Sequence, residues 1–228
     1  MSRPRMIAIR NTILKLLLLC LLMTVLAVLM LRWVDPPASA FILSSPGSYT
    51  EHRPVWSNWE EISPWIPMAI IAAEDQKFPF HWGFDAAAIQ QAIADRLEGN
   101  RMRGASTITQ QLAKNLFLWP GRSWLRKGVE AYFTLLLEGF LSKRRILELY
   151  INLVEFGPYI FSAGSASQRY FDKSTGKITR QEACMLAAVL PNPRSSNLRQ
   201  PSNRLKKRAK HISKQISALG GVDYLKFL

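Results

Sequence analysis

The order of apolar and polar positions divides the chain into one long apolar run followed by a series of amphipathic segments. Residues 16–31, LLLLCLLMTVLAVLML, carry no charge, and as a helix they span about 24 Å. The apolar neighbours on either side extend this run towards the ~30 Å hydrocarbon core of a bilayer. We therefore predict a transmembrane anchor over residues 13–34.

Charges flank this run unequally. Four cations precede it and two acids follow it: Arg3, Arg5, Arg10 and Lys15, then Asp35 and Glu51. By the positive-inside rule, the tail 1–12 is cytoplasmic and the body of the chain lies on the outer side of the membrane. The triplet Ala38-Ser39-Ala40 leaves a second interpretation open, a cleaved signal peptide. The length of the run and the arginine that closes it favour the uncleaved anchor.

After the anchor, helical periodicity dominates. A proline-rich linker covers residues 35–54, the main domain 55–200, and a basic C-terminal helix, packed on that domain or continuing it, covers 201–228. Helices are predicted to begin at the capping residues Asp85, Ser106 or Thr107, Ser123, Ser142, Thr179 and Ser202, with a further helix over 163–171. The helix from Ser142 is expected to reach Phe156. No sustained alternation of period two is present, so we predict an all-α domain on a single anchor.

The net charge of the chain indicates which kinds of molecule it can bind. Thirty Lys and Arg against sixteen Asp and Glu give a net charge of +14, which favours a polyanionic partner. Residues 183–222 contain basic residues but no acid, and they lack the aromatic residues of single-strand binders. We expect contact with anionic membrane lipids and no nucleic acid. Cys20 and Cys184 are far apart in apolar runs, so neither a disulfide framework nor a cysteine metal site is expected.

The first candidate for chemistry is the acidic pair Glu74-Asp75. It follows an apolar run and precedes the aromatic residues of FPFHWGF. A carboxyl group buried against aromatic rings has a raised pKa, which suits a general acid or base. A helix-end carboxylate in an ordinary salt bridge is the alternative.

The second candidate is the segment 104–115, GASTITQQLAKN. At helical spacing Ser106, Gln110 and Lys114 share one face, and Thr107 and Gln111 lie beside them. Hydroxyl, amide and ammonium groups at a helix N-terminus suit a sugar and its phosphate. A solvated helix face is the alternative.

The third candidate is a cluster of cations around one acid. Arg122, Arg126 and Lys127 precede Glu130, and the last two are its neighbours at i,i+4 and i,i+3 on a helix. These cations could bind a diphosphate, with the carboxylate kept ionised between them. A surface ion pair worth under about 1 kcal/mol is the alternative.

Together these segments resemble the family 51 glycosyltransferases, the peptidoglycan glycan polymerases. The motifs that carry the resemblance are EDQKF through HWGFD at 74–85, GASTITQQLAKN at 104–115, RKxxE at 126–130, SKxxILExYxN at 142–152 and EACMLAAVLPNP at 182–193. They follow one another in the family's order over about residues 55–195. Because no acyltransferase domain follows, the similarity is to the monofunctional biosynthetic transglycosylases.

The resemblance implies a lysozyme-like, two-lobed helical fold and a polymerase that acts on lipid II. Glu74 would deprotonate the 4-hydroxyl of the acceptor lipid II, which attacks the lipid-linked glycan donor with inversion to a β-1,4 bond. Glu130 would organise the cations that receive the departing undecaprenyl diphosphate. The implied substrate-binding residues are Ser106, Gln110, Gln111, Lys114, Arg122, Arg126 and Lys127. No certain cofactor is implied, although a divalent cation, Mg or Mn, could accompany the diphosphate.

Two departures from the family pattern affect helix packing rather than chemistry. Residues 162–166 read SAGSA where the family has a Gly-x-Glu-Ala-Ala stretch, and Asp172 stands where glycine is common.

Two other classes of protein remain as alternatives. A lysozyme-like hydrolase would have no reason to carry the cations at 114–127, and a non-catalytic membrane scaffold would not need the Glu74 and glutamine clusters. Cell-division or penicillin-binding proteins are further expected partners.

Overall fold

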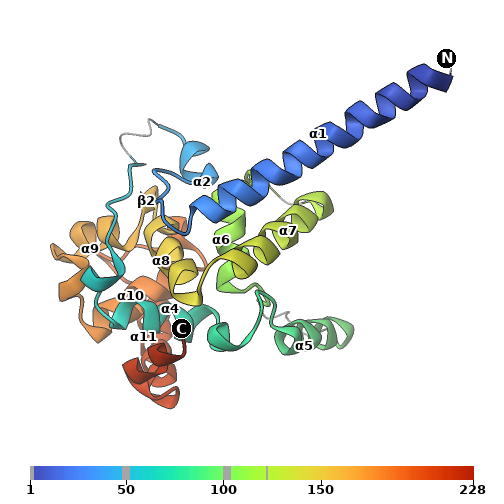
Figure 1. Ribbon diagram of the computed structural model, residues 1–228. Coiled ribbons are helices and arrows are strands. Elements are labelled where there is room, and N and C mark those ends of the chain that lie inside the picture. The colour runs from blue at the N-terminus through green and yellow to red at the C-terminus, as the bar shows by residue number, and fades with distance from the viewer. Residues whose placement is uncertain (1–2, 48–51, 100–103, 122) are drawn as a thin grey trace.

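The computed structural model describes residues 3–47, 52–99, 104–121 and 123–228, and it is mostly helical. One long helix, α1 (Arg3–Met30), projects from a domain built of shorter helices (Figure 1). Residues 7–30 of α1 are long and apolar enough to cross a membrane, and almost none of their surface is buried in the domain. This arrangement agrees with the predicted all-α domain on one apolar helix.

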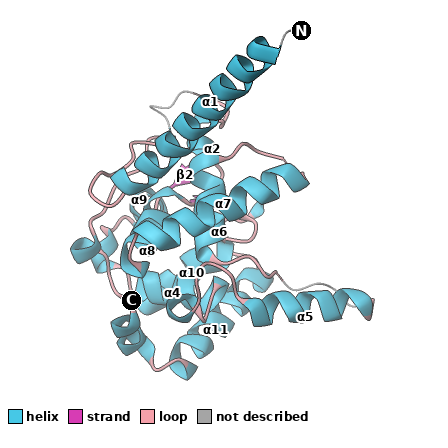
Figure 2. Cartoon of the chain, turned by 45° about the vertical axis from the view of Figure 1, so that its right-hand side comes forward, coloured by secondary structure: helices cyan, strands magenta, loops and turns pink. Residues whose placement is uncertain are grey.

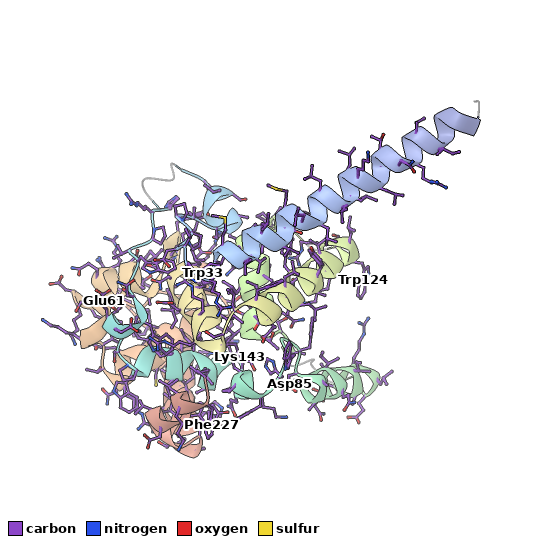
Figure 3. All side chains as sticks on the ribbon, in the orientation of Figure 1. Trp33, Glu61, Asp85, Trp124, Lys143 and Phe227 are labelled. Atoms are coloured by element: carbon purple, nitrogen blue, oxygen red, sulfur yellow. The ribbon has the colours of Figure 1, made fainter. Side chains whose placement is uncertain are left out.

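The last turns of α1 are attached to the domain. Val28 is fully buried, and Thr24 Oγ1 lies 2.7 Å from Tyr132 Oη on α7 (Trp124–Phe140). Arg145 Nε donates to the carbonyl of Leu31 at 2.8 Å. The first polar contact holds α7 beside α1, and the second ties the end of α1 to α8 (Lys143–Leu153). Trp124 lies at the far tip of α7 (Figure 3).

The core of the domain is assembled around α4 (Trp65–Glu74), which is apolar on all sides except at its last residue. Helices α10 (Arg180–Val189) and α11 (Asn203–Ala218) pack against it. Helix α6 (Ile108–Phe117) packs between α7 and α8 (Lys143–Leu153). An all-round apolar helix has to be enclosed by other helices, so its terminal carboxyl, Glu74, is brought to the edge of a buried core.

A short helix, α2 (Ala40–Leu43), lies within the segment that the sequence assigns to a linker. Ser39 Oγ accepts a hydrogen bond from the Ile42 backbone at 3.2 Å, and both residues are buried. The helix packs against α6. The Ala38-Ser39-Ala40 triplet is therefore part of a buried helix cap.

The predicted N-caps are confirmed. The side chains of Asp85, Thr107, Ser123, Ser142, Thr179 and Ser202 each accept a backbone N–H of the helix that follows. These helices are α5 (Ala86–Leu97), α6, α7, α8, α10 and α11, while α9 spans Ala163–Phe171 as expected. Short 3₁₀ helices connect them: Trp59–Glu61, Phe78–Phe80, Thr175–Lys177, Pro193–Ser195 and Gly221–Phe227. The capping chemistry satisfies N–H groups that the helix itself leaves unpaired.

The prediction that the helix from Ser142 reaches Phe156 is wrong. Helix α8 ends at Leu153, and β1 (Glu155–Gly157) then pairs antiparallel with β2 (Ile160–Phe161) in the one small sheet of the described chain (Figure 2). Pro158 lacks an N–H and disfavours a helical conformation in the residue before it. The chain therefore leaves the helix and turns into a hairpin.

The departures from the family pattern have a structural reason. Asp172 is left-handed, with φ 55°, where it ends α9, and after glycine the short Asp side chain is one of those that tolerate this conformation best. Ser162 also has a positive φ, and its Oγ caps α9 by accepting from the Ser165 backbone at 3.0 Å. At the start of α9, where the sequence departs from the family pattern, a serine side chain therefore caps the helix.

Helix α11 lies at the end of the domain away from α1 (Figures 1 and 2). The basic C-terminal segment is thus remote from the anchor, although the sequence favours a membrane contact for it. One of its arginines points into a cleft instead.

Candidate active site

A cavity of about 370 Å³ opens beside the C-terminal end of α4. Its lining comes from α4, the start and middle of α6, the first turns of α7, and the turn after α10. The lining residues are Glu74, Ser106, Gln110, Gln111, Lys114, Arg126, Lys127, Glu130, Leu190 and Pro191. Both candidate catalytic glutamates and every described residue that the resemblance implies for substrate binding are therefore brought to one cleft.

Glu74 enters this cleft as the last residue of α4. Its side chain is only 12% exposed. Gln111 Nε2 donates to Glu74 Oε2 at 3.1 Å, and Tyr150 Oη in turn donates to Gln111 Oε1 at 2.8 Å. The buried Tyr150 hydroxyl thereby fixes which end of the Gln111 amide faces the carboxyl.

Burial raises the pKa of Glu74 above its ordinary value, while Gln111 and Arg208 act in the opposite direction. The direction agrees with the sequence prediction, but the expected aromatic surroundings do not. Phe80 and Trp82 are largely exposed, and Phe80 packs against Tyr224 and Phe227. Phe80 and Trp82 therefore do not enclose the carboxyl, which is buried at the end of α4.

The neighbouring acid, Asp75, has a structural position. Its carboxylate accepts from the Ile108 backbone at 3.0 Å and lies 2.9 Å from His81 Nε2. It is buried and belongs to neither wall of the cleft. Asp75 thus ties the end of α4 to the start of α6 and fixes Glu74 against Gln111.

The polar face of α6 lies as predicted, with one exception. Gln111 and Lys114 face the cleft, and Ser106 lies at its rim. Gln110 also lines the cavity, but its Oε1 accepts from the Thr107 backbone at 3.0 Å as part of the capping box. Thr107 is the exception, because its hydroxyl is buried and donates to the Gly83 carbonyl at 2.6 Å.

The cation cluster surrounds Glu130. Lys127 forms an ion pair with this carboxylate, and Arg126 lies 3.6 Å from its second oxygen. Glu130 itself is only 4% exposed. Arg126 lines the cavity, and its Nε is buried without a hydrogen-bond partner among the described residues. Arg122, the fourth predicted cation, lies outside the described residues.

Lys114 joins the cluster from α6. Burial lowers the pKa of its ammonium group, whereas the Glu130 carboxylate raises it. An anion that enters the cleft therefore stabilises the protonated, charged form of Lys114.

Arg208 is the residue that sequence reasoning missed. It extends from α11 and donates to Glu74 Oε1 at 3.1 Å, while its Nε is buried and unpaired among the described groups. In the sequence it lies in a run of cations, NRLKKRAK, which reads as a solvated or membrane-facing helix. Only the packing of α11 on α4 reveals its contact with Glu74.

The described residues contain no group of three or more His, Cys, Asp or Glu side chains that could hold a metal ion. The single carboxylate beside the cations, Glu130, is already engaged by Lys127 and Arg126. The donor set suits an anion, and it does not fit a resident divalent cation.

A helical domain in which a buried carboxyl and a cluster of cations share one polar cleft is suited to group transfer from an anionic, phosphate-bearing substrate. The sequence comparison gives the family. Residues 42–217 match the family described as Transglycosylase, and the chain belongs to this family.

Curated relatives agree. The chain is 49% identical over 208 residues to a "Biosynthetic peptidoglycan transglycosylase" of Pseudomonas fluorescens, a match that covers 89% of this chain and 87% of the relative. Proteins with the same description from Ectopseudomonas mendocina and Shewanella oneidensis are 47% and 49% identical, covering 96% and 89% of this chain and 93% and 89% of theirs. The similarity therefore extends over nearly the whole length of both partners.

Proposed function

We propose that this protein is a peptidoglycan glycosyltransferase that polymerises glycan strands. It transfers the lipid-diphosphate-linked growing glycan to the 4-hydroxyl of lipid II, forms a β-1,4 bond with inversion, and releases undecaprenyl diphosphate. Family membership and the descriptions of the relatives support this activity. The observation that carries the assignment of roles is the single cleft shared by the buried Glu74 and the cations around Glu130.

In this proposal Glu74 is the general base. The acceptor hydroxyl gives its proton to the Glu74 carboxylate while its oxygen forms the new bond to the anomeric carbon of the donor. The raised pKa of Glu74 makes it a stronger base than an exposed carboxylate. Gln111 holds the carboxyl in place through the 3.1 Å hydrogen bond.

The bond that breaks joins the anomeric carbon to the diphosphate, whose negative charge grows as it leaves. Lys114, Arg126 and Lys127 are assigned to this charge, because preorganised cations in a desolvated site stabilise it most. The position of all three cations on the cavity that Glu74 also lines supports the assignment. Glu130 holds Arg126 and Lys127 in position, and Ser106 and Gln110 are assigned to sugar or diphosphate oxygens. Arg122 stays a sequence-based candidate for the same role.

A divalent cation is not needed as a resident group in this proposal. Mg²⁺ is usually bound through substrate phosphates and one or two carboxylates, and the carboxylate that lies between Arg126 and Lys127, Glu130, is paired with both. Mg or Mn would therefore enter bound to the diphosphate, and the three cations supply the charge stabilisation without it.

Cations also separate this proposal from a peptidoglycan-cleaving enzyme. A hydrolase works on a neutral glycosidic leaving group, which gives no reason for three cations in the cleft. A scaffold, in turn, would not need a buried Glu74 held by a hydrogen-bonded Gln111. Synthesis explains both features.

The substrates explain the anchor. Lipid II and the growing glycan are both held in a membrane, and α1 confines the enzyme to the same surface, which raises the frequency of encounter. We place α1 in the bacterial inner membrane with its N-terminus cytoplasmic and the domain periplasmic, because the cations precede the apolar run. Anionic lipids, and cell-division or penicillin-binding proteins, are proposed as neighbours there.

The test is incubation of the detergent-solubilised full chain with labelled lipid II, followed by separation of polymer from monomer. Polymer that a lysozyme digests is the expected product. Release of shorter fragments from preformed glycan, with no polymer from lipid II, would overturn the proposal in favour of a cleaving enzyme.

A further inference from the structure

We propose that a groove beside α2 binds the polyprenyl chain of the lipid-linked substrate where it leaves the diphosphate, with Phe41 as its main contact. This inference rests on the proposed function for the nature of the lipid. It adds a binding role to a segment that lies between the anchor and the catalytic cleft and that the sequence alone assigns to a linker.

The groove is a cavity of about 410 Å³ with a largely apolar wall. Phe41, Pro120, Pro191 and Pro193 are its apolar lining residues. The uncharged polar ones are Ser44, Asn192 and Ser195, and both serine hydroxyls donate to backbone carbonyls. Its charged side chains, Glu155 and Arg194, are paired with each other, with Arg194 Nε 3.0 Å from Glu155 Oε1. An apolar wall with a self-neutralised ion pair favours a hydrocarbon over a sugar, because proline offers no N–H and an unpaired sugar hydroxyl would lose its water.

The groove continues into the catalytic cleft. Pro191 lines both cavities. The Lys114 ammonium lies 5.6 Å from the centre of the Phe41 ring, within the range of a cation–π contact. A diphosphate held by Lys114 therefore lies next to Phe41, so a hydrocarbon attached to that diphosphate meets the ring first.

One wall of the groove belongs to a helix near the anchor. Helix α2 lies beside the base of α1 in both views (Figures 1 and 2). Leu43 and Trp119, close in sequence to the groove residues Phe41 and Pro120, are more than half exposed. Apolar side chains thus follow the groove on both of its connecting segments, on the side of the domain where the membrane-spanning helix leaves it.

The position of Phe41 is fixed rather than incidental. Its neighbour Ile42 is 1% exposed, and the buried Ser39 caps the helix. These two residues anchor α2 on α6, which leaves Phe41 directed to the cleft beside Lys114. A wall held this way can bind a chain without first being ordered, which avoids part of the entropy cost of binding.

The experiment compares two probes on the full chain in detergent: farnesyl diphosphate and inorganic diphosphate. Both offer the same charge chemistry to Lys114, but only the first carries isoprene units. The quantity measured is the ratio of their dissociation constants, determined for wild type and for Phe41→Ser, Phe41→Leu and Pro193→Ser. Leu97→Ser on α5, which is 84% exposed and distant from the groove, is the matched control. Circular dichroism checks the fold of every variant.

We expect Phe41→Ser to reduce the preference for the farnesyl compound about tenfold, on the order of the loss of contact with part of an aromatic ring. Phe41→Leu should keep most of the preference, Pro193→Ser should reduce it, and Leu97→Ser should leave it unchanged. If Phe41→Ser does not fold, Pro193→Ser alone decides the outcome.

Two results would overturn the inference. Equal weakening of both diphosphates would show that Phe41 acts only through Lys114, and an unchanged ratio in folded Phe41→Ser and Pro193→Ser would show that the groove does not bind the chain. Failure of the proposed function gives a different result, since wild type would then produce no polymer from lipid II whatever its preference for the prenyl chain.

Discussion

Replacing Glu74 with glutamine removes the proposed base and changes little else. The amide oxygen can still accept the hydrogen bond that Gln111 now makes at 3.1 Å. Its NH₂ group would face the Arg208 donor, so the ion pair is lost, but Arg208 is 39% exposed and can turn to solvent. The neutral amide also avoids the desolvation that the buried carboxylate suffers. We therefore expect the free energy of unfolding to change by less than about 1 kcal/mol.

Catalysis should change far more. Loss of a general base lowers kcat by about 10²-fold or more, which is at least about 2.7 kcal/mol of the activation barrier. Affinity for a donor analogue should stay near the wild-type value, because the cations around Glu130 are untouched. The loss should therefore fall on kcat and not on donor binding.

The assay combines initial rates of polymer formation from labelled lipid II, donor-analogue affinity, and circular dichroism. Glu60→Gln is the matched control: this carboxylate is 73% exposed and pairs with Arg144 on the surface, so the same chemical change should leave the rate unaltered. A folded Glu74→Gln protein that polymerises at the wild-type rate would refute the role of Glu74 as base.

Three further outcomes follow from the contacts in and around the cleft. Glu130→Gln should weaken donor-analogue affinity as well as the rate, because it releases the cations that the carboxylate holds; unchanged affinity in a titration would contradict this. Arg208→Gln should move the acidic limb of the pH–rate profile to higher pH, since Arg208 lowers the pKa of Glu74 and activity is lost as the pH falls through that pKa; Lys207→Gln, an exposed neighbour, should leave the profile in place. Gly164→Ala should lower the free energy of unfolding by about 1–3 kcal/mol, measured by urea denaturation, because the added Cβ would lie 2.3 Å from a backbone oxygen.

Local chemistry made most of the fold predictable. Capping residues such as Asp85, Thr107 and Ser202 mark where helices begin, because an N–H group left unpaired at a helix end selects its partner within three residues. The β-hairpin after Leu153 was harder to predict from the sequence. Its strands are two and three residues long, too short for an alternating pattern, and the interruption by Pro158 was the only available signal.

The contacts of the candidate site also fall into two groups, those within one helix and those between distant segments. Residues that meet within one helix, such as Arg126, Lys127 and Glu130, follow from spacing, because side chains three and four positions apart on a helix are neighbours. Contacts between distant segments do not follow from spacing. Arg208 lies 134 positions from Glu74, in a basic run that points equally to solvent or to a membrane, and only the burial of α4 by α11 brings the two together.

Phe41 illustrates why such residues escape a sequence reading and still matter for function. Phe41 lies in a proline-rich segment without helical periodicity, so the sequence assigns it to a linker. Its role depends on two contacts that form only on folding. Ile42 must be buried so that α2 packs on the domain, and the Lys114 ammonium must lie next to the Phe41 ring. A diphosphate site can be predicted from cations that lie on one helix. The groove beside α2 cannot, because its lining residues, such as Phe41, Pro120 and Pro193, lie far apart in the chain.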